Sequence, residues 1–376
     1  MADAYIKLAA WVLIALLVSL INRRFIFFAL VAGGVVQSII GFFQFFWHRD
    51  LGLQWLGESV LRPDNLEVAR TYLGSPAFAE GFGGQGEGLL LRAYGTFPHP
   101  NVLAAFLVLA LIASYYLFFL YRNVDYSHGR DYSRHFILAL LTGVIFILWL
   151  GLLLTFARVG WLIAGLATAG FLVVQGSISQ YWGCRKSSGL TTSDRQGRCR
   201  LWRLEVEPCK ILIVIIIVLL IVLFSIFHWA IIPRLATLTP DNFTVQERLG
   251  DYRLAWQMIK EKPWLGYGLT LNMGERPIHN LYLLIATEVG LVGLAVFLIF
   301  VGWLYFRNIV ILRQGRRILK DSSCPQVLQR CRRALTLRMT SLLMLTCLLL
   351  YGFFDHFLWT LRPGLGMFWL VVGMLL

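Results

Sequence analysis

Long apolar runs follow one another along the chain, separated by shorter polar segments. Each run is continuous and about 20 residues long, the length that an α-helix needs to cross a bilayer. Backbone polar groups cannot stay unpaired in lipid, so these runs must be helices. The pattern predicts an all-α, polytopic integral membrane protein, with residues 1–376 in a single membrane domain. About nine transmembrane helices are expected, at residues 5–21, 25–47, 102–121, 135–154, 159–176, 211–232, 281–306, 337–357 and 363–376.

Charged residues are few and unevenly distributed. Hydrophobic residues make up 58% of the chain and charged residues 14%, while the net charge is +14. The basic residues concentrate in residues 177–210 and 307–336, which we interpret as basic cytoplasmic loops. This clustering beside apolar runs argues against nucleic-acid binding as the source of the charge. Five of the six cysteines lie in the same two segments without a CxxC spacing, so no zinc site is expected.

The charge distribution also sets the expected topology. With both basic segments inside, the N-terminus lies outside and the C-terminus inside. Two long loops then face the exterior, at residues 48–101 and 233–280. A tight turn at Thr155–Arg158 and a short segment at Asp355–Pro363 face the same side.

The external loop at residues 233–280 contains a predicted helix in the stretch TVQERLGDYRLAWQMIKEKP. Thr244 and Glu247 have the spacing of a capping box, and Pro263 ends the helix. Four apolar residues between them share one helical face. These residues are Leu249, Tyr252, Trp256 and Ile259. We therefore expect an amphipathic helix that lies on the outer membrane surface or over the mouth of a cavity.

Cationic and titratable residues collect at the outer ends of several predicted spans. They are Arg92, Arg158, Arg248, Arg253, His279, Asp355, His356 and Arg362. Snorkelling or capping explains any one outer arginine, but several that converge on one membrane face indicate a site. Asn101 and Asn280 stand at N-cap positions, so two helices point their positive ends at the same face. Arginines and helix N-termini together predict an anion site, and at the lipid boundary this suggests a lipid-linked phosphate.

Two residues of the stretch IHNLYLLIATEVGLVGLAVF can titrate. His279 has an unperturbed pKa near neutrality, and its position fits a general base and an interfacial helix cap equally well. Glu288 follows nine residues later, on the opposite helical face. An intramembrane carboxylate must face protein or water, so we expect Glu288 to tie two spans together, with Arg158 as its partner.

Four stretches, in this order, resemble the O-antigen ligase and O-antigen polymerase family of bacterial membrane glycosyltransferases. They are RAYGTFPHPNVLAAFL, LLTFARVGWLIAGLA, QERLGDYRLAWQMIKEKPWLGYG and IHNLYLLIATEVGLVGLAVF. The resemblance defines an O-antigen ligase-like core at residues 90–300 and extends more loosely to FDHFLWTLRPGLGMFWLVVGM near the C-terminus.

The resemblance implies a GT-C-like fold and a metal-independent glycosyltransferase that needs no cofactor. Its members take a glycan from an undecaprenyl-pyrophosphate-linked donor at the outer face of the bacterial inner membrane. They transfer it to an acceptor hydroxyl of a glycolipid or glycan, in lipopolysaccharide and other surface polysaccharide biosynthesis. Arginines matching Arg158 and Arg248 hold the pyrophosphate, and the histidine matching His279 activates the acceptor. We add Arg92, Asn101, Arg253 and Asn280 as expected substrate-binding residues, and Glu288 and Asp355 as structural ones.

Some features of the chain depart from the family, and two other functions stay open. Family members have ten or more spans, so we expect that N-terminal spans are absent here or that the sequence is a fragment. The chain ends with its last span, which argues against relatives that carry a large soluble domain. A polymerase would show the same motifs as a ligase. A transporter of lipid-linked oligosaccharide would instead show internal repeats and polar residues through the membrane depth, which this sequence does not.

Overall fold

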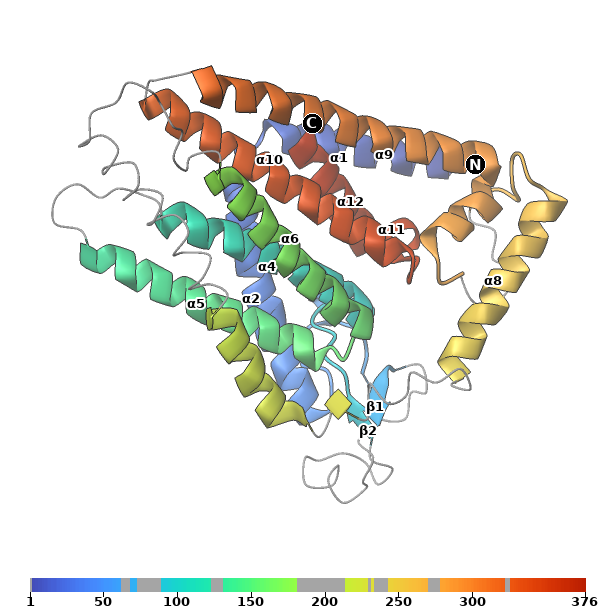
Figure 1. Cartoon of the computed structure of the whole chain (residues 1–376). Helices are drawn as coiled ribbons and strands as arrows, with labels where there is room; N and C mark the ends of the chain where they lie inside the picture. The colour runs from blue at the N-terminus through green and yellow to red at the C-terminus, as the bar shows by residue number, and fades with distance from the viewer. Residues whose placement is uncertain are drawn as a thin grey trace.

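The computed structural model describes residues 2–61, 68–72, 89–122, 131–180, 214–228, 231–232, 243–269, 278–321 and 325–376 (Figure 1). These residues are almost all helical. The helices are α1 (Ala2–Leu20), α2 (Arg23–Trp47), α4 (Pro100–Arg122), α5 (Asp131–Leu154), α6 (Arg158–Gln180), α8 (Phe243–Glu261), α9 (Leu281–Asp321), α10 (Pro325–Gly352), α11 (Phe357–Thr360) and α12 (Arg362–Leu375), with a further helix at Val214–His228 and a 3₁₀ turn η1 (Gln54–Leu56). Strands β1 (Arg70–Tyr72) and β2 (Leu89–Leu91) form a two-stranded antiparallel ribbon.

The helices coincide with the apolar runs, which confirms the all-α membrane class. Within the described residues, five helical segments are long and apolar enough to cross a membrane: Arg23–Trp47, Pro100–Tyr121, His135–Leu154, Leu281–Leu319 and Gln329–Gly352. Four shorter apolar helices of 10–17 residues lie at other expected spans: Ala9–Leu20, Arg158–Val173, Val214–His228 and Arg362–Leu375.

The second basic segment, residues 307–336, is mostly helical instead of a loop. Helix α9 continues through it to Asp321, and α10 already begins at Pro325. Leucine, arginine, lysine and glutamine are good helix formers, so the helices continue beyond the apolar stretch that marks the membrane. The two helices therefore extend beyond the expected spans 281–306 and 337–357. The other basic segment, residues 177–210, lies mostly outside the described residues.

Helix α4 forms the centre of the bundle. It packs against α2, α5, α6 and α10, and 94% of the residues in its most apolar 18-residue stretch are buried. The corresponding share is 39% in α2 and 44% in α5, as expected for helices whose outer faces meet lipid. Gly34 lets α2 approach closely, because a Cβ there would lie 2.6 Å from Ala110 and 2.7 Å from Leu148. Small residues at such contacts are typical of helix packing in membranes.

The predicted amphipathic helix is α8, which lies on the outside of the bundle near the start of α9 (Figure 1). The rest of the protein covers its predicted apolar face only in part. Ile259 is buried, whereas Leu249 and Trp256 are exposed at 47% and 57%, and Ala255 is fully buried. Ala255 packs with Ile278 and Leu284 at the start of α9. The small Ala255 side chain allows a close helix contact, so the face with the largest apolar side chains is not the one that packs.

A break in α9 anchors the turn that follows α8. Gly290 has φ 73° and ψ 179°, and a Cβ there would lie 2.1 Å from the carbonyl oxygen of Trp264. Around the break, Gly268 N–H donates to Glu288 O at 2.7 Å and Leu291 N–H donates to Pro263 O at 2.8 Å. Only glycine fits this close approach of two backbones. The backbone bonds hold the C-terminal end of α8 against α9.

Candidate functional site

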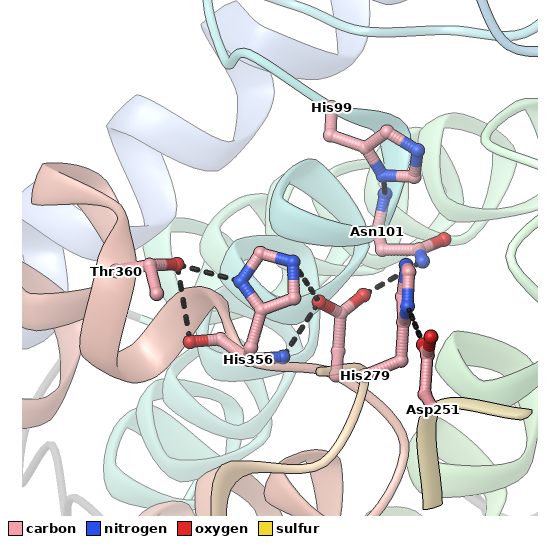
Figure 2. A network of polar contacts seen from close by, with 7 residues as sticks. His99, Asn101, Asp251, His279, His356 and Thr360 are labelled. Atoms are coloured by element: carbon pink, nitrogen blue, oxygen red, sulfur yellow. Dashed lines mark hydrogen bonds and ion pairs between the residues drawn. The ribbon is translucent and has the colours of Figure 1, made fainter. Parts of the chain in front are cut away.

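A histidine–carboxylate pair joins the start of α9 to α8. His279 Nδ1 lies 2.8 Å from Asp251 Oδ2, and the two side chains are 30% and 20% exposed (Figure 2). An ionised carboxylate accepts a hydrogen bond from a protonated Nδ1, which leaves Nε2 with a free lone pair. The pair is thus both accessible and arranged for His279 to accept a proton.

Asn280 caps the helix that follows His279. Its Oδ1 accepts hydrogen bonds from the backbone N–H groups of Tyr282 and Leu283, both at 3.0 Å. Its Nδ2 donates to Phe353 O at 3.1 Å, which ties the cap to the end of α10. The predicted N-cap is confirmed, and the positive end of α9 lies beside His279.

A second histidine faces the first. The rings of His356 and His279 have centroids 5.4 Å apart and an interplanar angle of 73° (Figure 2). His356 Nδ1 lies 2.6 Å from Thr360 Oγ1, and its backbone N–H donates to Asp355 Oδ1 at 2.8 Å. Asp355 is buried and also accepts a bond from Asn101 Nδ2 at 2.9 Å. This arrangement fits the structural role expected for Asp355.

Arg92 and Asn101 hold the segment before α4 in place. Arg92 is 6% exposed; its Nε donates to Thr155 O at 2.7 Å and its Nη2 donates to Asn101 Oδ1 at 3.1 Å. Asn101 also donates a hydrogen bond to Asp355. The hydrogen bonds of Arg92 and Asn101 therefore connect the turn before α6 to the segment that follows α10. Both residues were expected to bind substrate, but their polar atoms serve this framework, and the geometry supports a positioning role.

His99, not Asn101, caps α4. Asn101 N–H donates to His99 Nδ1 at 3.1 Å, and Val102 N–H donates to His99 O at 3.0 Å. The predicted cap was wrong because Pro100 occupies the first helical position, where its missing N–H costs nothing. The helix therefore starts earlier than predicted, and the Asn101 side chain is available for other partners.

The pKa values of His99, His356 and Asp355 are all lowered in the folded protein. Burial, reinforced by the positive charge of Arg92, lowers the pKa of His99 to about 4. Burial also lowers the pKa of His356, against the attraction of Asp355. Burial alone would raise the pKa of Asp355, but His356 and the hydrogen bond from Asn101 outweigh it and lower that pKa. At neutral pH the cluster therefore holds neutral His99 and His356 beside an ionised Asp355.

Two of the predicted arginines come together in the structure. Arg158 begins α6 and Arg248 lies on α8, yet the two guanidinium groups interact electrostatically. Arg248 Nε is buried and has no hydrogen-bond partner among the described residues. Adjacent like charges with an unsatisfied donor favour an anion. Arg253 is exposed elsewhere on α8 and does not share this position.

Glu288 has a different partner from the one expected. It is 7% exposed, and its Oε2 accepts a hydrogen bond from Trp359 Nε1 at 2.8 Å. Trp359 belongs to α11, so the contact ties α9 to the segment that carries His356. The expected partner, Arg158, neighbours Arg248 instead. The expectation placed Glu288 in an unbroken helix, whereas it lies two residues before the break at Gly290.

Two residues of the site were missed by the sequence argument: Asp251 and His99. Asp251 follows Arg248 by three residues, which places both on one helical face, so it could have been found. His99 directly precedes Pro100 and accepts the Asn101 N–H, so the proline at the first helical position could have identified it as the cap. The contact between the His356 and His279 rings could not have been found, because the two residues lie far apart in sequence.

The fold and the site define a multi-pass helical membrane protein with histidines, carboxylates and paired arginines gathered at one end of the bundle. The model of the O-antigen ligase family matches residues 144–298, which confirms the resemblance seen in the sequence over that segment. The matched segment contains Arg158, Arg248, Asp251 and His279. Comparisons with curated proteins and with solved structures gave no match.

Proposed function

We propose that the chain transfers a glycan from an undecaprenyl-pyrophosphate-linked donor to an acceptor hydroxyl. The observation that carries this proposal is the arrangement inside the matched segment. The accessible His279–Asp251 pair lies one helical turn from Arg248, which interacts with Arg158. A general base and a cationic site are the two groups that metal-independent glycosyl transfer from a pyrophosphate needs.

In the proposed reaction, the acceptor oxygen attacks the anomeric carbon of the donor sugar. The new carbon–oxygen bond forms as the bond between that carbon and the pyrophosphate oxygen breaks. The electron pair leaves with undecaprenyl pyrophosphate, and the acceptor proton passes to His279 Nε2. Asp251 holds the ring in the tautomer that exposes Nε2 and stabilises the positive charge that develops on it.

The cationic pair acts on the leaving group. Arg158 and Arg248 would bind the pyrophosphate oxygens with paired, charge-assisted hydrogen bonds, and Arg248 Nε has a donor free for this purpose. The N-terminus of α9, capped by Asn280, adds a positive potential beside His279. Arg253 would contribute only to the approach of the donor, because its side chain is exposed.

We place this chemistry in a GT-C-like fold of about nine spans, with the site at the outer face of the bacterial inner membrane. The support is the position of the cluster opposite the basic ends of α9 and α10, which the charge rule assigns to the cytoplasm. The acceptor would be a glycolipid in a ligase and a second lipid-linked glycan in a polymerase, and the same residues would serve both.

Purified full-length chain in lipid nanodiscs tests this function. With a lipid-linked glycan donor and an acceptor, it should release undecaprenyl pyrophosphate, and His279→Ala should reduce release by about 10²–10⁴-fold while donor binding persists. His228→Ala is the matched control, because His228 is exposed on a different helix. Equal release by wild type and His279→Ala would refute the assigned base. Movement of intact donor across the bilayer without cleavage would support a transporter instead.

A further inference from the structure

A cavity of about 300 Å³ lies at the end of the bundle opposite the histidine cluster. Its lining residues are Asn22, Arg24, Phe25, Phe28, Leu120, Tyr121 and Arg333. Leu120 and Tyr121 belong to the last turn of α4, whose first turn touches the cluster. Arg333 lies near the start of α10, and Asp355 follows the opposite end of that helix. The cavity is therefore separate from the proposed glycosyl-transfer site.

Two arginines from distant parts of the sequence line this cavity. Arg24 comes from the first turn of α2 and Arg333 from α10, and no acidic residue is among the described lining residues. Two guanidinium groups that line one cavity can bind an anion through charge-assisted hydrogen bonds. Asn22 caps α2 by accepting the Arg24 N–H at 3.1 Å, so a helix N-terminus also faces this region.

A buried hydroxyl adds an independent sign of a ligand. Tyr116 lies one helical turn before Leu120 and is 2% exposed, and its hydroxyl has no partner among the described residues. The ring stacks on Phe27 with centroids 4.7 Å apart, and the phenol interacts electrostatically with both Arg24 and Arg333. Tyr116 does not line the cavity itself, but a buried donor without a partner is costly, and an anion bound between the two arginines would lie near it.

One wall of the cavity is apolar and faces outward. Phe25 is 68% exposed and Phe28 is 42% exposed, and both lie on α2, a membrane-length helix. A free phosphate would not need this wall, whereas the acyl chains of a lipid would lie along it. Aromatic and basic residues together are typical of the membrane interface. We propose that this cavity binds the phosphate headgroup of an anionic membrane lipid.

Native mass spectrometry of the delipidated full-length chain tests this proposal. The probes are phosphatidylglycerol, phosphatidylcholine and inorganic phosphate. One phosphatidylglycerol should bind with at least tenfold higher affinity than phosphatidylcholine, and the Arg24→Gln, Arg333→Gln double variant should lose at least tenfold of that affinity. Arg313→Gln is the matched control, because Arg313 is exposed on α9 and does not line the cavity. Its affinity should stay within twofold of wild type.

Two further measurements keep the test decisive. Arg24 is exposed, so the single variant Arg24→Gln is expected to fold and to show a smaller loss even if the double variant does not. Tyr116→Phe keeps the stacked ring and should weaken phosphatidylglycerol binding about threefold. Equal losses in Arg24→Gln and Arg313→Gln would show a general effect of basic charge and overturn the proposal. Displacement of the lipid by millimolar inorganic phosphate would overturn the lipid assignment.

Discussion

Replacing Asp251 by asparagine tests the arrangement on which the proposed chemistry depends. The carboxylate accepts a hydrogen bond from His279 Nδ1 at 2.8 Å. An asparagine amide can donate to Nδ1 instead, which would move the ring proton to Nε2 and remove the base. The shape of the side chain changes little, so the variant isolates the tautomer from the packing of α8.

The expected magnitude follows from the exposure of the pair. General-base catalysis contributes about 10²–10⁴-fold in rate. His279 and Asp251 are 30% and 20% exposed, so water can replace part of the lost interaction. We therefore expect a loss near the lower limit, about 10²-fold in kcat, which corresponds to about 3 kcal/mol of barrier height. The KM for the lipid-linked donor should change little.

Single-turnover glycan transfer in nanodiscs measures this effect without interference from product release. Gln257→Ala, on the exposed face of α8, is the control for changes in that helix. Thermal unfolding should be similar for wild type and both variants. A rate for Asp251→Asn within threefold of wild type would refute the assignment of Asp251 as the residue that orients His279.

Five further outcomes are expected. The pKa of His99 falls from 6.5 to about 4 on folding, so the unfolded chain binds the proton first as the pH decreases. The free energy of unfolding, measured by chemical unfolding, should therefore fall by about 3 kcal/mol between pH 6.5 and pH 4. A free energy of unfolding that does not change with pH would contradict this. His99→Asn should keep the helix cap and remove this pH dependence. Gly290→Ala should destabilise the fold by more than about 2 kcal/mol in thermal unfolding, because its φ of 73° and its close backbone contact admit no Cβ; unchanged stability would refute the contact. Glu288→Gln keeps an acceptor for its tryptophan partner and should transfer glycan within about threefold of wild type, whereas loss of transfer by the folded variant would give Glu288 a catalytic role. Arg248→Gln should raise the donor KM and lower the transfer rate together, by about tenfold or more in kcat/KM, and an unchanged KM would remove Arg248 from the anion site.

The local features of the chain were predictable from its sequence. Apolar runs of membrane length place the helices, since unpaired backbone groups are too costly in lipid to leave another choice. Pro263 ends the predicted helix within residues 243–269, and Asn280 caps α9, because both effects act within one helical turn. The second basic segment was mistaken for a loop because charge reports the membrane boundary and not the end of a helix.

The contacts of the candidate site depend on tertiary packing. Asp251 meets His279 across 28 positions, Glu288 meets Trp359 across 71, and Asn101 meets Asp355 across 254. Periodicity gives the face of a single helix but not which face packs, as the exposed Trp256 shows. The close approach of backbones at Gly290 decides where α8 lies, and only then do its polar side chains meet those of α9. The sequence by itself determined the membrane class and the residue types at its polar end, while the packing of helices distant in sequence decided their partners.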